Sequence, residues 1–402
     1  MKINRLDLLD KFKEKGGKKN VLIVSDAFYP LVGGATIVVD SLAKSLAKFC
    51  NVAVVTSNGK GACDFDSKAE YLIIRCKGVL ISKNIGCLGF PNMDSRFKKL
   101  INSLNIDIIH IHSYFSLAKF FIKFAKKNNI PILIHGHSKF YEEFLHSSHS
   151  KLIAKKLTKN AMKIVNSADL VLPVSNGTLE RYKSLGLLAN ALVMPNATNL
   201  TFLKDKSFVQ KINEKYKLNN SCIKLCFLSR ITKVKNIDIL VEMADLLKKQ
   251  NFKFELYIIG FGEDEQYLKN KAKSLKVNDV VKFLGKVTEV KEKSALIQNM
   301  DLLVFPSVVD NCCLVKYEFA SQKVPTLCVK DSATSEDIFD NQTGYTAEES
   351  SEKFAEKVIE IFGDKKSYTK VKQEAFDTLG KSWDMVSQKL NDIYDELIKS
   401  KE

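Results

Sequence analysis

Residues 223–249 read IKLCFLSRITKVKNIDILVEMADLLKK, and this stretch decides the fold. Residues 223–229 have the length and apolar composition of a buried strand, and residues 236–249 carry apolar side chains at helical spacing. A short basic loop joins the two. A strand that passes through a loop into a helix is the repeating unit of a parallel sheet with crossover helices. The stretch therefore predicts an α/β fold.

The same alternation of strands and helices fills both halves of the chain. Strands are expected at residues 20–25, 52–56, 106–111, 131–134 and 170–173, and again at 223–229, 255–259, 280–284 and 302–305. Helices are expected at residues 35–49, 151–165, 236–249 and about 370–399. The polar stretch at residues 195–206 separates the two blocks and predicts a hinge there. A chain of 402 residues with 45% hydrophobic content suits two such domains better than one.

Charge separates the two halves. Residues 1–200 hold 29 Lys and Arg against 14 Asp and Glu, a net +15, and the remainder holds 33 against 32, a net +1. Such asymmetry suggests a polyanionic partner for the first half: lipid headgroups, nucleic acid or an acidic glycan. The alternative is a surface of solvated lysines without a partner.

The cysteines and the apolar runs indicate the compartment. The nine cysteines are odd in number and scattered, without the paired spacing of metal ligands, which favours a reducing, cytosolic location. We see no apolar N-terminal signal region, and no apolar run approaches the ~18 residues that a spanning helix needs. We therefore expect neither a signal peptide nor a transmembrane helix.

The basic loop at residues 229–236 (SRITKVKN) is the first candidate site. Arg230 and Lys235 flank the beginning of the predicted helix, whose free N–H groups and dipole favour an anion. The planar fork of arginine and the point charge of lysine together suit a diphosphate. Taken alone, the loop could equally be solvated surface.

A second candidate site follows the strand at residues 302–305. The segment FPSVVDNCCLVKYEFA (305–320) places Asp310 and Glu318 eight positions apart, the latter on a helix that is otherwise apolar. A carboxylate among apolar neighbours is costly to bury without a partner. We therefore expect Glu318 to contact a cation or hydroxyl groups, the alternative being an exposed glutamate.

An ordered set of segments resembles family 4 of the glycosyltransferases, which has the GT-B fold. The segments are VLIVSDAFYPLVGGAT, DIIHIHSYF, IPILIHGHS, SADLVLPVSN, VMPNAT, SRITKVKN, IIGFGEDE, VKFLGKV, MDLLVFPS, DNCCLVKYEFASQKVP and DNQTGY. The resemblance implies two Rossmann-like domains facing an interdomain cleft. It gives an acceptor-side domain at residues 1–199, on which a C-terminal helix at 375–402 packs, and a donor-binding domain at 200–374. It also implies retaining transfer of a hexose from a nucleoside-diphosphate sugar, a UDP-sugar, without a metal cofactor.

The resemblance assigns roles in the second domain. Arg230 and Lys235 match the pair that holds the donor diphosphate. Asp310 and Glu318 match two family glutamates, of which the first contacts the sugar and the second the ribose. The remaining donor-binding positions implied are Gly260, Gly262, Cys312, Cys313 and Leu314.

The first domain has its own matches. Gly33 and Gly34 correspond to a loop whose backbone approaches the donor, and His137 corresponds to a histidine close to the transferred sugar. With Asp310 and Glu318, His137 completes the implied catalytic set.

The chain departs from the family at several positions. Asp310 is one methylene shorter than the usual glutamate, and Cys312 and Cys313 replace an aromatic residue and a glycine. Residues 332–336 (SATSE) stand where many members have Gly-Gly-x-Pro-Glu, and Ala197 replaces a glycine. These departures leave the sugar open and raise the alternative of lost activity.

Two signals suggest a metal instead. Asp64-Phe65-Asp66 has the spacing of a metal-binding DxD motif, but it lies in a polar connection and is interpreted as a loop. All six histidines lie between residues 110 and 149, and His110/His112 and His135/His137 alternate along strands so that each pair shares a face. With no cysteine or carboxylate to complete a ligand shell, we interpret them as strand-end residues facing the cleft.

The basic half is expected to meet a membrane. Lysines at positions 151, 155, 159 and 163 form one stripe along a helix, and residues 1–19 combine apolar residues at helical spacing with seven Lys or Arg. Both suit an anionic bilayer, and the alternative is a helix packed on its own sheet. The segment HGHSKFYEEF resembles the acceptor-side region of bacterial diacylglycerol glucosyltransferases, which implies a lipid acceptor. A glycan acceptor of the cell envelope fits equally well. We expect a cytoplasmic protein that is peripheral on the inner membrane face, and no nucleic-acid partner. The competing functions are a nucleotide-sugar 2-epimerase and a non-catalytic nucleotide-sugar-binding protein.

Overall fold

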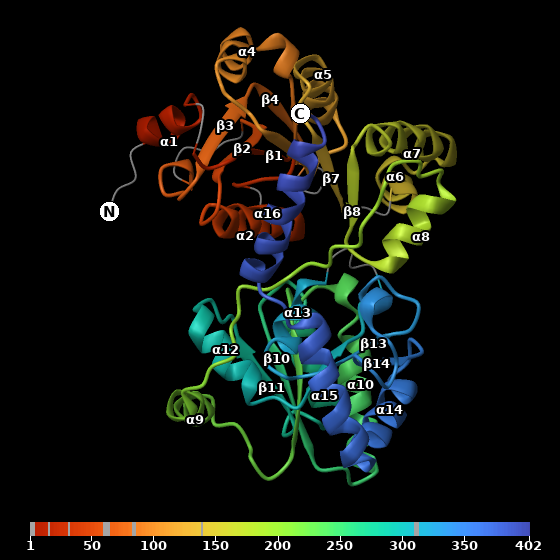
Figure 1. Cartoon of the computed structure of the whole chain (residues 1–402). Coiled ribbons are helices and arrows are strands. Elements are labelled where there is room, and N and C mark those ends of the chain that lie inside the picture. Colours follow the sequence, from red (N-terminus) through yellow and green to blue (C-terminus); the bar gives the residue numbers. More distant parts are fainter. Residues whose placement is uncertain are drawn as a thin grey trace. The chain divides into compact units, whose positions relative to one another are not determined.

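The computed structural model describes residues 5–14, 17–30, 33–58, 65–82, 86–137, 140–308 and 313–402. The chain divides into two compact units, Met1–Pro195 with Trp383–Glu402, and Asn196–Ser382. The boundaries expected from the sequence, after residues 199 and 374, differ from these by 199 − 195 = 4 and 382 − 374 = 8 residues. Each unit is drawn in Figure 1 with its own sheet and helices.

The first unit is built on a six-stranded parallel sheet in the order β3-β2-β1-β6-β7-β8. Its strands are β1 (Asn20–Val24), β2 (Asn51–Ser57), β3 (Leu72–Cys76), β6 (Ile108–Ile111), β7 (Ile132–Gly136) and β8 (Leu170–Pro173), and β4 (Gly78–Ser82) and β5 (Gly86–Gly89) form a separate antiparallel hairpin. Its helices are α1 (Arg5–Lys11), α2 (Gly34–Leu46), η1 (Pro91–Met93), α4 (Ser95–Asn102), α5 (Ser116–Asn128), α6 (Phe140–Ser148), α7 (Lys151–Val165), α8 (Asn176–Ser184) and α16 (Trp383–Lys399). The strands of this sheet are apolar along most of their length because helices cover both faces.

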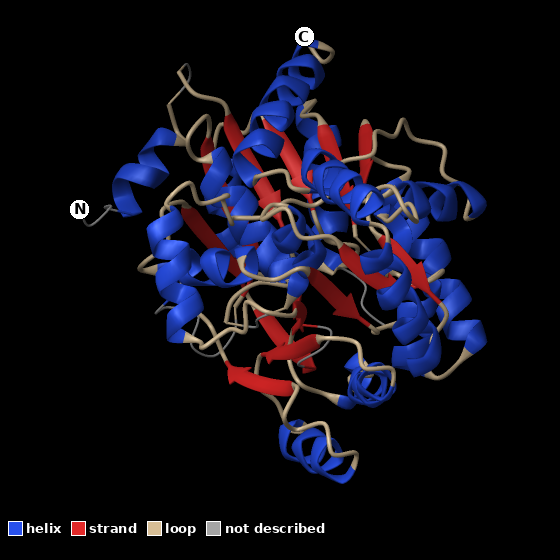
Figure 2. Ribbon diagram, turned by 90° about the horizontal axis from the view of Figure 1, so that it is seen from below, coloured by secondary structure: helices blue, strands red, loops and turns tan. Residues whose placement is uncertain are grey.

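The second unit repeats this plan with a parallel sheet in the order β11-β10-β9-β12-β13-β14. Its strands are β9 (Ile223–Leu228), β10 (Phe254–Ile259), β11 (Val281–Gly285), β12 (Leu302–Phe305), β13 (Thr326–Val329) and β14 (Tyr345–Ala347). Its helices are α9 (Lys206–Lys215), η2 (Lys233–Lys235), α10 (Asp238–Lys249), α11 (Glu265–Ser274), α12 (Val290–Gln298), α13 (Leu314–Ala320), η3 (Thr334–Asp337), α14 (Ser351–Gly363) and α15 (Lys365–Leu379). Figure 2, with helices in blue and strands in red, shows helices flanking the strands. The predicted α/β class is confirmed.

The C-terminal segment differs from the sequence expectation. One continuous helix over about 370–399 was predicted, and this is wrong: α15 ends at Leu379 and α16 begins at Trp383. Gly380 sits at the break, where a Cβ would come 2.6 Å from the carbonyl oxygen of Phe376, and the backbone of Lys381 accepts a hydrogen bond from Thr198. The interruption is also where the chain leaves the second unit for the first.

Helix α16 is part of the first unit and packs on α2 (Figure 1). Trp383 is 3% exposed, and Asp384 forms an ion pair with Lys48 at 2.6 Å. Farther along the helix, the buried Tyr394 hydroxyl makes a 2.7 Å hydrogen bond with His110 Nδ1 on β6. The last helix therefore reaches side chains in the middle of the sheet.

Both sheets reverse their strand order at one point, between β1 and β6 in the first and between β9 and β12 in the second. In open parallel sheets, ligands bind beyond the carboxyl ends of the strands at such a switch point. These two edges are therefore where binding residues are expected. Within the described part of the chain, no helix is both long and apolar enough to span a bilayer.

Candidate active site

The loop after β9 carries the two predicted diphosphate ligands. Arg230 is exposed, and Lys235 ends the short helix η2 with its Nζ 5.7 Å from the ring centroid of Phe305, the last residue of β12. In addition, the Ser307 hydroxyl donates a hydrogen bond to the Val234 carbonyl at 3.5 Å. The loops after β9 and β12 therefore meet at the switch point of the second sheet.

Two glycines hold this loop from the side of β10. Gly260 has φ +143°, and a Cβ there would lie 1.9 Å from the carbonyl oxygen of Ser229. A Cβ on Gly262 would lie equally close to the carbonyl oxygen of Ile231, whose N–H donates to the Phe261 carbonyl at 2.9 Å. The resemblance implies that these glycines lie beside the nucleotide. The structure gives them a further role, because only glycine lets the two backbones approach so closely.

The helix α13 carries Glu318, which has the cationic partner expected for it. Glu318 Oε1 lies 2.6 Å from Lys293 Nζ on α12, and the side chains are 19% and 21% exposed. At the other end of α13, Cys313 is buried and occupies the N-cap, and Leu314 is half-buried against the core. Asp310 and Cys312 lie outside the described residues.

A buried lysine one turn before the end of α13 was missed by the sequence analysis. Lys316 is 3% exposed, and its Nζ donates to the Thr334 carbonyl at 2.9 Å and lies 3.3 Å from Asp337 Oδ2. Burial alone would lower the pKa of Lys316, but the Asp337 carboxylate and the neighbouring Cys313 and Cys328 together outweigh it, and the pKa is raised. The Tyr317 hydroxyl donates to the same carboxylate at 2.5 Å. These contacts hold both ends of η3 (Thr334–Asp337), which overlaps the segment 332–336 that departs from the family's Gly-Gly-x-Pro-Glu.

In the first unit, Gly33 and Gly34 begin helix α2. Both are exposed, Gly33 has extended backbone (φ −155°), and a Cβ on Gly33 would meet nothing within 4 Å. Neither strain nor packing within the described part of the first unit requires glycine at position 33.

Four histidines gather on one face of β6 and β7, as their alternation predicts. The register pairs His110 with Leu133 and Ile111 with Ile134, so His112 stands beside His135. His112 Nδ1 and His137 Nε2 are 3.0 Å apart, and the His135 and His137 rings stack with centroids separated by 4.4 Å.

These imidazoles are neutral. Burial is the largest cause in each case: it lowers the pKa of His137 to about 4 and holds the pKa of His110, His112 and His135 well below the ordinary value. Neighbouring histidines lower the pKa of His110, His112 and His135 further. His137 is thus brought together with three other histidines, as a neutral hydrogen-bonding group at the carboxyl edge of its sheet.

A carboxyl group that the sequence analysis did not select lies at the same edge. Asp26 follows β1, and its side chain accepts a hydrogen bond from the Ser113 hydroxyl, which follows β6. Burial raises the pKa of Asp26 to about 7, despite the opposing hydrogen bonds from Ser113 and the Phe115 backbone. The sequence signal that could have identified this pair is a polar residue shortly after a predicted strand. Asp26 follows β1 and Ser113 follows β6, the two strands on either side of the switch point.

The DxD interpretation can be examined at one of its two positions. Asp64 lies outside the described residues, and Asp66 is 8% exposed. Its two carboxylate oxygens accept 2.8 Å hydrogen bonds from Nε and Nη2 of Arg75. Asp66 is therefore engaged by a guanidinium group in a bidentate ion pair.

Comparisons with known proteins agree with this geometry. The family model described as "Glycosyltransferase Family 4" matches residues 32–202, and "Glycosyl transferases group 1" matches residues 208–378. The alpha-monoglucosyldiacylglycerol synthase of Acholeplasma laidlawii is 24% identical over 331 residues, 79% of this chain and 81% of the relative. The GDP-mannose-dependent alpha-(1-6)-phosphatidylinositol monomannoside mannosyltransferase of Mycolicibacterium smegmatis is 24% identical over 339 residues, covering 81% and 84%.

A solved structure shows the fold. The crystal structure of Anabaena HepE in complex with UDP superposes with a TM-score of 0.73 at 16% identity, over 94% of this chain and 100% of that one. The fold is therefore GT-B, with two Rossmann-like domains. Together with the two family models, which cover most of both domains, this assigns the protein to the group 1 glycosyltransferases of family 4, and it is an enzyme of that class.

Proposed function

We propose that this glycosyltransferase moves a hexose from a UDP-sugar to a lipid or glycan acceptor of the cell envelope, with retention of anomeric configuration. The observation that carries the proposal is the loop of Arg230 and Lys235 at the switch point of the second sheet. Two cations held beside the carboxyl ends of β9 and β12 suit a diphosphate leaving group. The glycines at 260 and 262 keep that loop in place before the donor arrives.

Preorganised cations supply the electrostatic stabilisation that the leaving diphosphate needs. We infer from this that transfer proceeds without a bound Mg²⁺ or Mn²⁺. Glu318 would accept hydrogen bonds from the ribose hydroxyls, with Lys293 orienting the carboxylate through their 2.6 Å contact. Asp310 would face the sugar, and His137, neutral at working pH, would hydrogen-bond to the sugar or the incoming hydroxyl.

The nature of the acceptor is supported by two observations. By their names, one of the relatives given above makes a monoglucosyldiacylglycerol, and the other transfers mannose to a phosphatidylinositol monomannoside. In addition, Lys151, Lys155, Lys159 and Lys163 are all exposed on α7, together with Leu152 (82%) and Ile153 (50%). Cationic and apolar side chains side by side on a helix suit the surface of an anionic bilayer.

The N-terminal segment supports membrane attachment less strongly. Phe12 is 1% exposed and Leu9 packs against the core of the first unit, so these two apolar residues serve internal packing. Leu6 remains 66% exposed. Attachment would therefore rely on α7.

A panel of labelled donors crossed with acceptors tests the function. Purified protein would be incubated with UDP-glucose, UDP-galactose, UDP-N-acetylglucosamine or GDP-mannose, each with vesicles containing diacylglycerol or a glycosylated diacylglycerol. We expect a glycolipid to form from one UDP-sugar even when a chelator is present. NMR of this glycolipid should show the same anomeric configuration as the donor. Product from GDP-mannose alone would refute the UDP-sugar donor, and an inverted product would refute retention. Strict dependence on Mg²⁺ would refute transfer without a metal.

Vesicle sedimentation tests the membrane surface separately. We expect binding to anionic but not neutral vesicles, released by salt as the screening length shortens. Lys155→Glu/Lys159→Glu should abolish it. Lys366→Glu/Lys370→Glu is the matched control, because it reverses two exposed lysines at the same spacing on α15. Equal loss in both variants would show that net charge, and not α7, determines binding.

A further inference from the structure

We propose that His110, His112 and His135 form a binding site for one divalent transition-metal ion of the zinc type. The proposal rests on the histidine cluster alone and does not depend on the donor or acceptor proposed above. Its three residues belong to the first unit, whereas Arg230 and Lys235 belong to the second.

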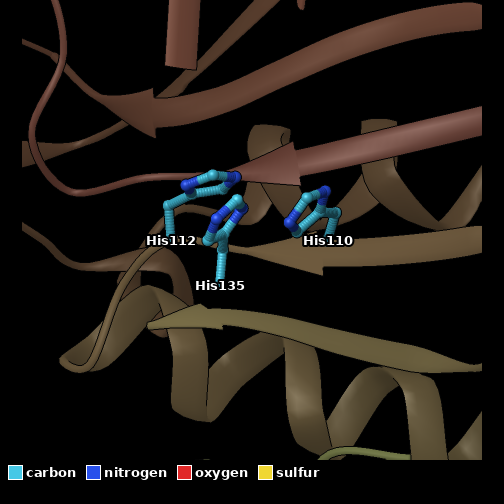
Figure 3. A group of neighbouring side chains, drawn as sticks. All are labelled: His110, His112 and His135. Atoms are coloured by element: carbon cyan, nitrogen blue, oxygen red, sulfur yellow. The ribbon is translucent and has the colours of Figure 1, made fainter. Parts of the chain in front are cut away.

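The three side chains converge from two neighbouring strands. His110 lies on β6, His112 directly follows it, and His135 lies on β7 with its Cα beside that of His112 in the parallel register. One ring nitrogen from each residue lies within 4.8 Å of the other two. Figure 3 shows the three rings next to one another. Alternation along a strand puts all three on the same face, so the convergence is a property of the backbone.

The ring nitrogens that face this point have no other use. His110 is 0% exposed, His135 0% and His112 9%. Within the described residues, Nε2 of His110 and Nε2 of His112 have no hydrogen-bond partner. In the same part of the chain, His135 keeps at least one ring nitrogen without a partner, since the Met194 backbone is the one described group that reaches this ring. Buried polar atoms are rarely left in this state, and a metal ion would satisfy three of them at once.

The opposite nitrogens of two rings are already positioned. Tyr394 OH bonds to Nδ1 of His110 at 2.7 Å, and Nδ1 of His112 bonds to Nε2 of His137 at 3.0 Å. Metal-binding histidines characteristically use their second nitrogen in this way, which fixes the tautomer and the ring orientation. Because each of these hydrogen bonds uses Nδ1, Nε2 is the nitrogen that His110 and His112 can offer to a metal.

The chemistry of the ligands selects the metal. Neutral imidazoles suit Zn²⁺, Cu²⁺, Ni²⁺ and Co²⁺, whereas Mg²⁺ and Ca²⁺ require oxygen ligands. Zn–N bonds of about 2.0–2.1 Å would form where rotation of the rings about their side-chain bonds brings the three nitrogens around one ion. The fourth position would fall to water.

The test uses the full chain, stripped of metal with a chelator and dialysed. Zinc would be titrated in competition with a chromophoric chelator, and Co²⁺ would be followed by its visible absorption. We expect one equivalent of Zn²⁺ and an intense Co²⁺ spectrum of the tetrahedral kind. His112→Gln and His135→Gln should each weaken Zn²⁺ at least 100-fold.

Two further variants keep the result interpretable. Tyr394→Phe leaves all three ligands and removes the orienting hydroxyl, so a 10- to 100-fold loss is expected from a metal site. His149→Asn changes a histidine outside the cluster, at a left-handed position (φ 52°) that asparagine tolerates, and should bind as the unmodified chain does. Circular dichroism checks that each variant is folded. Absence of stoichiometric binding, or equal binding by folded His112→Gln and the unmodified chain, would overturn the proposal.

Discussion

Gly262→Ala tests whether close backbone packing positions the Arg230 loop. The added Cβ would lie 1.9 Å from the carbonyl oxygen of Ile231, 2.6 Å from its carbonyl carbon and 2.8 Å from its nitrogen. All three atoms are backbone atoms, so no side-chain rotation relieves the clash. Ile231 is itself fully buried and hydrogen-bonded to Phe261, which leaves little room for local adjustment.

The size of the displacement follows from these distances. Real Cβ contacts essentially never fall below 3.0 Å, so the two backbones must separate by 3.0 − 1.9 = 1.1 Å. A catalytic group misplaced by about 1 Å can cost on the order of 100-fold in rate. Overpacking of this kind also lowers the free energy of unfolding by roughly 1–3 kcal/mol. We therefore expect turnover to fall about 100-fold in a protein that still folds.

The assay is donor turnover together with UDP affinity by calorimetry, and thermal unfolding for stability. Gly363→Ala is the matched control, since a Cβ there meets nothing within 4 Å and φ is not in the left-handed region. Gly363→Ala should leave turnover unchanged and should raise the free energy of unfolding by about 0.4–1 kcal/mol. Unchanged turnover and UDP affinity in Gly262→Ala would refute the claim that this contact positions Arg230.

Three other outcomes are expected. Arg230→Ala and Lys235→Ala should each reduce turnover about 100-fold without unfolding the protein, because each loses charge-assisted bonds of roughly 1.5–3 kcal/mol to the diphosphate; near-normal turnover in both would exclude this phosphate site. Glu318→Gln should weaken UDP binding more than Lys293→Gln does, since only the former changes the carboxylate that accepts hydrogen bonds from the ribose hydroxyls. Equal losses of UDP affinity would mean that the two variants act by breaking the ion pair between Glu318 and Lys293. Asp26 has a folded pKa of about 7, above its unfolded value of 3.8, so it destabilises the fold as pH rises from about 4 to 7, by up to roughly 4 kcal/mol. Asp26→Asn should therefore flatten the pH dependence of stability in that window, and an unchanged slope in chemical denaturation would contradict the raised pKa.

Local pattern was enough to predict much of the fold. The strand β12 and the helix α7 have the predicted bounds, and β8 does as well. Buried parallel strands are short apolar runs with turn signals at both ends, and α7 is a long amphipathic helix with a serine N-cap, so periodicity identifies both. The edge strand β3 and the short strands β13 and β14 were not predicted, because three to five residues carry too little pattern.

The site was less predictable because its contacts join distant parts of the chain. Glu318 could be expected to have a partner, but nothing in the sequence around Lys293 identifies that partner. The contact of Lys316 with Asp337 likewise depends on how α13 meets η3. Pairing of this kind is decided by tertiary packing, which propensity and periodicity do not describe.

The two sheets share one strand order but differ in the charge of their binding edges. In the second unit, the loops at the switch point present Arg230 and Lys235, which suit an anionic leaving group. In the first unit, the same place holds neutral imidazoles and a carboxyl group, Asp26, whose pKa is about 7. The excess lysines of that half, meanwhile, stand partly on the outer face of α7. A diphosphate would find no cation among the described histidines and Asp26 at the first edge, whereas a hydroxyl group or a metal ion would find ligands. The proposed division of roles between the domains would therefore follow from the side chains placed at each switch point, because the topology is the same in both.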